Sequence, residues 1–306
     1  MTATAPAPRL DDLAYITSET AATHETAAIL DFVTRWLEHH DYHHALSCLN
    51  LLRDLKGQQK REDGLTPAIL HELSQSCYTI ALADSGYTLP DTEALLCLNF
   101  THDLGEEFGV SREGLLNHWR QDQTLSGCNI HQGWLESLST QFSRMAKKMN
   151  NVSLFPLAGN PTKTDHEQYF YAMMADPVTA MAKFLDRIHN MATMIGVKSI
   201  PKQREYLKET VTLRDILFLA AQTWPQYKPA LLTMNKIVTT QILFTNRYLD
   251  IVDPENRRPL PFVALPRLHR MKPLPPGLDP LQITQARALT CIAWARAYQK
   301  PAPSTP

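Results

Sequence analysis

The sequence lacks long hydrophobic runs, an excess of either charge and any paired cysteine motif. No apolar stretch approaches the roughly 20 residues that a transmembrane helix needs. The first residues show neither the basic n-region nor the apolar h-region of a secretory signal. Thirty basic and 31 acidic residues leave a net charge of −1, which offers no general attraction to nucleic acids or anionic membranes. We therefore expect a cytoplasmic protein without a nucleic-acid or membrane partner, in which any phosphate recognition comes from a local pocket.

The composition is typical of a globular protein with reduced cysteines. Hydrophobic residues make up 44 % of the chain and charged residues 20 %, a balance that can bury a substantial core. The five cysteines are an odd number and form no CxxC pair. This favours small buried side chains in a reducing compartment over a disulfide framework.

Hydrophobic residues recur at helical spacing along most of the chain, and no segment shows the two-residue alternation of a strand. Polar breaks that contain glycine or proline separate the helical segments. Asp176 is expected to cap the clearest helix, with Pro177 at its first position. The sequence predicts an all-α fold, with a short helix after Ser111 and others over about 26–55, 68–83, 92–109, 134–149, 177–196, 202–222, 228–248 and 281–299.

Composition divides the chain into three parts. Residues 1–25 are rich in Ala, Thr and Pro and are expected to form a flexible arm. Residues 26–222 hold most of the helical segments and form the expected domain. Residues 223–306 form a helical, proline-rich extension, in which proline is too dense over 253–280 for regular structure.

The strongest local signal for chemistry is the pair His102-Asp103. One imidazole nitrogen and one carboxylate oxygen suit a borderline divalent metal such as Mn²⁺, Fe²⁺ or Zn²⁺ better than Mg²⁺ or Ca²⁺. Glu106 lies four residues after His102, and Glu107 lies four residues after Asp103. A continuing helix would therefore keep both carboxylates near the metal. The dipeptide alone is a weak signal, because chance produces it often.

A second signal is an acidic residue inside the helix expected over 177–196. Asp186 shares a stripe with Asn190 and Thr193 among apolar neighbours. A carboxylate in such surroundings costs several kcal/mol unless its charge is compensated. Either a metal ion or a structural salt bridge would compensate it, and this helix alone does not decide between them.

A third segment carries Lys60 and Arg61 in a loop and His71 one turn into the next helix. The histidine-rich run over 39–44 looks more like a metal site at first sight. Its polar density indicates a solvated helix end instead.

Together the three segments resemble the HD-type hydrolase domain of the RelA/SpoT alarmone enzymes and their small single-domain relatives. The first segment matches in Gly57, Gly64 and the stretch 66–71, and the second is HDLGEE over 102–107. The third, DRIHNMAT over 186–193, keeps every spacing of the family motif DRxHNxxT and is the most specific. The resemblance covers about residues 45–222 and implies an HD-domain helical bundle.

The resemblance also implies roles for the matching residues. One Mn²⁺ would be held by four ligands: His71, His102, Asp103 and Asp186. Glu106 and Glu107 would orient or deprotonate the attacking water. The nucleotide would be bound by a further set: Lys60, Arg61, Lys147, Asn190, Thr193 and Arg204. The implied reaction removes pyrophosphate from the 3′ position of (p)ppGpp or of an analogue such as (p)ppApp.

The chain departs from the family at three positions near these motifs. Glu72 stands where the family usually has proline, Ala68 replaces a common aromatic residue, and Glu107 replaces aspartate. These residues show no counterpart of the family's synthetase domain, so pyrophosphate transfer from ATP is not expected. Two alternatives stay open: a phosphohydrolase of another nucleotide, such as an NADPH phosphatase, and a non-catalytic nucleotide-binding or antitoxin module. A homodimer or a cognate toxin would be the protein partner.

Overall fold

The computed structural model describes residues 19–62, 64, 66–122, 125, 132–145, 170, 173, 176–195 and 197–253. This part of the chain is helical and contains no strand, which confirms the all-α prediction. The expected proline-rich stretch and last helix lie outside the described residues. None of the helices within the described ranges is long and apolar enough to cross a membrane.

Most helices follow the expected segments closely, but the segment expected over 26–55 is divided into two helices at residues 40–42. In chain order they are α2 (Glu19–His39), α3 (His43–Lys56), α4 (Leu70–Asp84), α5 (Thr92–Thr101), α6 (Leu104–Glu107), α7 (Arg112–Gln121), α8 (Gln132–Met145), α10 (Pro177–Thr193), α11 (Ile200–Thr223) and α12 (Lys228–Val252). Asp176 caps α10 as predicted, because its carboxylate accepts a hydrogen bond from the amide of Thr179. Residues 19–25, expected in the flexible arm, instead form the first turns of α2.

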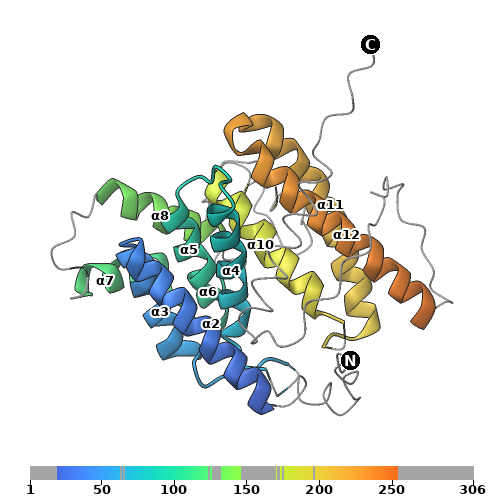
Figure 1. Cartoon of the computed structure of the whole chain (residues 1–306), viewed down its shortest axis with the longest axis horizontal. Helices are drawn as coiled ribbons and strands as arrows, with labels where there is room; N and C mark the ends of the chain where they lie inside the picture. Colours follow the sequence, from blue (N-terminus) through green and yellow to red (C-terminus); the bar gives the residue numbers. More distant parts are fainter. Residues whose placement is uncertain are drawn as a thin grey trace, which may run out of the picture.

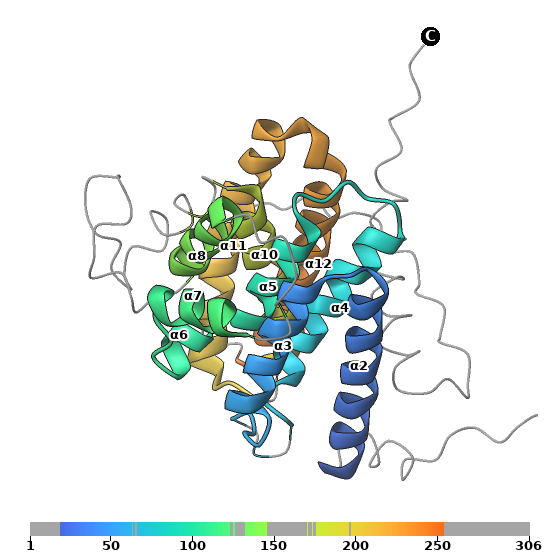
Figure 2. The same cartoon turned by 90° about the vertical axis from the view of Figure 1, so that its left-hand side faces the viewer.

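Helix α10 lies at the centre of the bundle. It packs against α4, α5 and α8 and also against α11 and α12 (Figure 1). Figure 2 shows α2 at one edge of the molecule, where it contacts α3 and α4. Buried side chains of α12, including Ile237 and Ile242, belong to the same hydrophobic core as those of α10. The expected domain boundary at residue 222 therefore falls inside one packed unit.

The helix expected over 92–109 is interrupted at the His102-Asp103 pair. The carbonyl of Asn99 would pair with the amide of residue 103 in a continuous helix, and it lies 3.0 Å from His102 Nδ1. The chain turns there and resumes as the four-residue helix α6. Gly109, with φ of 68°, ends this segment in the left-handed conformation that glycine adopts without strain.

The described cysteines behave as predicted. Cys48, Cys77 and Cys97 are buried and free. Burial raises the pKa of the Cys77 thiol to about 12, so this side chain is an uncharged hydrophobic group. Cys128 and Cys291 lie outside the described residues.

Arg187, the residue after Asp186, joins α10 to α11. Its side chain is completely buried. The guanidinium lies 3.3 Å from Glu209 Oε2 and 3.2 Å from Thr210 Oγ1, and it stacks 3.9 Å above the ring centre of Tyr206. The arginine of the DRxHNxxT motif is therefore a structural link in this protein.

Candidate metal centre

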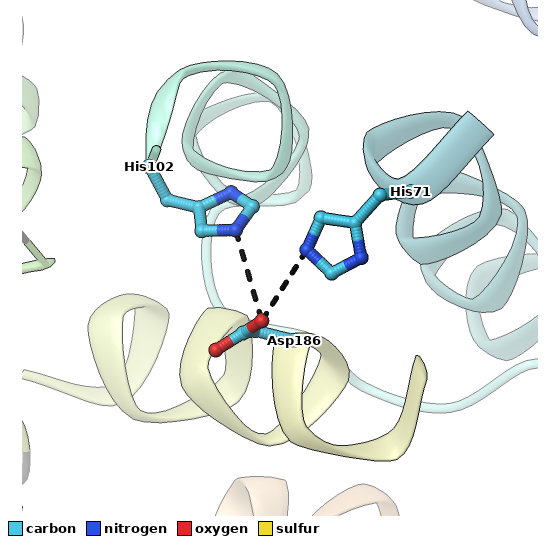
Figure 3. Close-up of side chains that lie close together, drawn as sticks. All are labelled: His71, His102 and Asp186. Atoms are coloured by element: carbon cyan, nitrogen blue, oxygen red, sulfur yellow. Dashed lines mark ion pairs between the residues drawn. The ribbon is translucent and has the colours of Figure 1, made fainter. Parts of the chain in front are cut away.

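Three side chains from three helices converge in the interior. His71 comes from the first turn of α4, His102 from the end of α5 and Asp186 from the middle of α10 (Figure 3). The Oδ1 atom of Asp186 lies 3.4 Å from His71 Nε2 and 3.8 Å from His102 Nε2. One ligand atom from each residue lies within 4.8 Å of the other two. Ligands about 2.1 Å from a common ion are roughly 3.0–3.5 Å apart, so small shifts would let this group hold a divalent metal.

Asp103 adds a second carboxylate to the group. Its Oδ2 atom lies 3.2 Å from His102 Nε2 and 3.7 Å from His71 Nε2. The Asp103 side chain is 33 % exposed, whereas those of the other three residues are at most 7 % exposed. His71, His102 and Asp186 are therefore shielded from solvent, and the cluster is accessible from the side of Asp103.

The outer ring nitrogen of each histidine is held by a hydrogen bond. A carbonyl oxygen can only accept, so His102 Nδ1 donates to Asn99, and Nε2 is the ring nitrogen that faces the cluster. His71 Nδ1 lies 2.7 Å from His189 Nδ1. Burial holds the pKa of His189 well below its usual value, so the neutral His189 ring can accept the hydrogen bond from His71 Nδ1.

The side chain of Gln75 lies close to both imidazoles of the cluster. The Gln75 amide nitrogen lies 2.7 Å from His71 Nε2 and 3.4 Å from His102 Nε2. An amide NH₂ group donates to an unprotonated ring nitrogen. When the two rings are neutral, both Nε2 atoms can present lone pairs toward Asp186, as metal-binding imidazoles do. The residues present fit a divalent ion.

The two oxygens of Asp186 have different partners. Oδ2 bonds to the ammonium of Lys183, while Oδ1 faces the imidazoles and accepts from Asn190. Burial alone would raise the pKa of Asp186, but the charge of Lys183 and the contacts with the histidines hold it well below its usual range. The salt bridge that the sequence left open is therefore present at one oxygen, while the other oxygen faces the imidazoles of the candidate metal group.

His102 is cationic in the protein without a metal. Burial by itself lowers the pKa of His102, but the adjacent Asp103 carboxylate and the charge of Asp186 raise it to about 9. A metal ion must therefore displace this proton before it can bind to Nε2.

A cavity of about 270 Å³ opens beside the cluster. Its charged lining comprises four basic residues and three carboxylates, and the basic residues come from the end of α3, the loop before α4 and the loop after α10. The lining residues are Lys56, Gln59, Lys60, Arg61, Glu62, Ala68, His71, Asp103, Glu107, Asn190, Val197 and Lys198. Basic groups around a small cavity suit an anionic ligand such as a phosphate.

The structure separates the expected substrate-binding residues into two groups. Lys60, Arg61 and Asn190 line the cavity. Thr193 does not line it, and its hydroxyl donates to the carbonyl of His189. Lys147 lies outside the described residues.

The side chain of Arg204 forms its hydrogen bonds with residues that do not line the cavity. Its Nε lies 2.8 Å from Asp253 Oδ2, and its other donors reach the carbonyls of Leu249 and Asp253. These contacts tie α11 to the end of α12 and use the donors that a phosphate would need. The structure therefore does not bring Arg204 to the cavity with the other expected phosphate ligands, and its contacts at the end of α12 were not visible in the sequence.

The two expected catalytic carboxylates also differ. Glu107 lines the cavity, whereas Glu106, on the same short helix, does not. Sequence analysis missed several residues around the centre: Lys56, Gln75, Lys183, His189 and Lys198. His189 and Lys183 had a usable signal, because each lies three residues from Asp186 on α10. The others had none.

Comparisons with family models, with curated proteins and with solved structures find no match to this chain. The assignment of function therefore depends on the side chains of the site and on the motifs of the sequence.

Proposed function

We propose that this protein is a Mn²⁺-dependent phosphohydrolase that releases pyrophosphate from the 3′ position of (p)ppGpp or of a related alarmone such as (p)ppApp. The observation that carries the proposal is the buried His71–His102–Asp186 group beside a cavity that four basic residues line. Asp103, which contacts both imidazoles, is the proposed fourth ligand. Mn²⁺ is the proposed ion because mixed imidazole and carboxylate ligands suit it, with Fe²⁺ or Zn²⁺ as the other candidates.

Each part of the site has a proposed task. A bound divalent ion would make a nearby water more acidic and stabilise negative charge on the phosphoryl group. Lys60 and Arg61, on the loop before α4, would bind the phosphates of the nucleotide. Glu107 would take a proton from the water that attacks the phosphorus next to the ribose 3′ oxygen. The bond from phosphorus to that oxygen breaks, and the oxygen is protonated as pyrophosphate departs.

The experiment that tests the proposal is a substrate panel. The full-length protein is incubated with Mn²⁺ and with ppGpp, ppApp, NADPH or a deoxynucleoside triphosphate. Pyrophosphate and inorganic phosphate are measured separately. We expect pyrophosphate from an alarmone. Faster release of phosphate from NADPH would favour the phosphatase alternative, and tight nucleotide binding without turnover would favour the non-catalytic module.

The affinity for Mn²⁺ is expected to increase with pH. Since the pKa of His102 is raised to about 9, the ring is protonated at neutral pH and competes with the ion for Nε2. The apparent affinity should therefore rise by up to about tenfold per pH unit below that pKa and level off above it. Titration calorimetry in buffers of different ionisation enthalpy should also detect about one released proton near pH 7. An affinity that does not change over this range would contradict the proposed role of His102.

A further inference from the structure

A buried lysine connects two carboxylates at the edge of the candidate metal centre. Lys56 is the last residue of α3, and its side chain is 4 % exposed. Its ammonium lies 2.6 Å from Glu72 Oε1 and 2.6 Å from Glu107 Oε2. The Glu72 side chain is 1 % exposed and belongs to the residue that directly follows His71. Lys56 and Glu107 both line the cavity, so this ion-pair network extends from the core to the site.

Burying the Lys56–Glu72 pair costs free energy, and a well-packed apolar pair would be at least as stable. The second Glu72 oxygen is buried and has no hydrogen-bond partner among the described residues. Fold stability alone therefore gives a weak reason for this pair. The Lys56–Glu72 pair also fixes the position of an ammonium group at the cavity wall.

Glu107 is the residue that this ammonium restrains. Its side chain is 41 % exposed and belongs to the four-residue helix α6, and the ion pair with Lys56 holds its carboxylate. A carboxylate held at one position can accept a proton from a water at one position, and a displacement of about 1 Å can cost two orders of magnitude in rate. Glu72 and Glu107 are also two of the three positions at which the chain departs from the motifs that it resembles.

We propose that Lys56, anchored by Glu72, is a positioning residue that fixes the Glu107 carboxylate in the cavity beside the metal centre. The inference rests on the proposed function, in which Glu107 accepts the proton of the attacking water. Lys56 acts on catalysis through Glu107, and its removal should change the rate of the chemical step more than the binding of substrate.

The test uses a variant designed to fold. Lys56→Met alone would leave Glu72 buried without its partner, so the main variant is Lys56→Met/Glu72→Met, which replaces the pair by apolar side chains. We expect kcat for pyrophosphate release to fall about 10- to 100-fold, while KM changes less than about threefold. Lys56→Arg, which keeps a cation at this position, should retain a higher kcat than Lys56→Met/Glu72→Met. Lys208→Met, at an exposed position on α11, is the matched control and should behave as wild type.

A second background separates positioning from substrate binding. In a Glu107→Ala protein there is no carboxylate to position, so adding Lys56→Met/Glu72→Met should lower kcat by less than about twofold. A full further loss in this background, or an effect confined to KM, would overturn the inference and make Lys56 a direct ligand of the substrate.

The position of Glu107 can also be measured without turnover. Crystal structures of the wild-type protein and of Lys56→Met/Glu72→Met should show one Glu107 conformer in the first and several in the second. The same single conformer in both would overturn the inference. Absence of hydrolysis by the wild-type protein would instead defeat the proposed function, and the crystal structures would still decide the role of Lys56.

Discussion

Replacing His102 by glutamine is expected to abolish both Mn²⁺ binding and pyrophosphate release. The glutamine amide cannot supply the imidazole lone pair that faces Asp186, so the group is left with one imidazole. A metal ion contributes several kcal/mol to the stabilisation of a phosphoryl-transfer transition state. Because each 1.36 kcal/mol corresponds to tenfold in rate, the expected loss of kcat/KM is about 10³-fold or more.

The control for this variant is His43→Gln, an exposed histidine at the start of α3. It should bind Mn²⁺ and turn over substrate as wild type does. Metal content after gel filtration and the rate of pyrophosphate release are measured for both variants. If His102→Gln keeps stoichiometric metal and at least a tenth of the activity, the metal centre has been placed wrongly.

Replacing Arg187 by methionine is expected to destabilise the fold by about 3–5 kcal/mol, because it leaves the nearly buried Glu209 carboxylate without its guanidinium partner. For a protein of this size the loss corresponds to a decrease in Tm of roughly 5–8 °C. The stacking on Tyr206 is lost as well. Urea unfolding followed by circular dichroism measures the change.

Two further variants test the cause of this destabilisation. Arg187→Met/Glu209→Met removes both charges and should recover a large part of the lost stability. Arg35→Met removes an exposed arginine from α2, whose side chain is 69 % exposed, and should change stability by less than about 0.5 kcal/mol. If Arg187→Met is no more destabilising than Arg35→Met, the link between α10 and α11 is not important for stability.

The cationic residues of the site have three different roles in this arrangement. Lys183 neutralises one oxygen of Asp186 within α10. Lys56 holds Glu107. Lys60 and Arg61 line the cavity and are the proposed phosphate ligands. The net charge of −1 is compatible with an anionic substrate, because recognition of the anion would depend on the four basic residues that line this cavity and not on the charge of the whole chain.

Helix positions and caps could be predicted from the sequence because they depend on neighbouring residues. Helical periodicity, the Asp176 cap and the breaks at glycine and proline are local features, and the structure confirms them. The metal-ligand candidates were also predictable, because imidazole and carboxylate groups in recognisable motifs select one kind of chemistry.

Only the tertiary structure decided which side chains meet. The contact between His71 and His189 joins residues 118 positions apart, and Arg204 is engaged by Asp253, 49 positions away. The sequence spacing between Lys56 and Glu107 did not indicate that the two side chains are in contact. Such contacts depend on how α3, α4, α10 and α12 pack, and packing is set by the whole core rather than by any local pattern. The sequence by itself therefore determined the helices and the chemistry available, while the packed bundle determined which groups form the site and which support it.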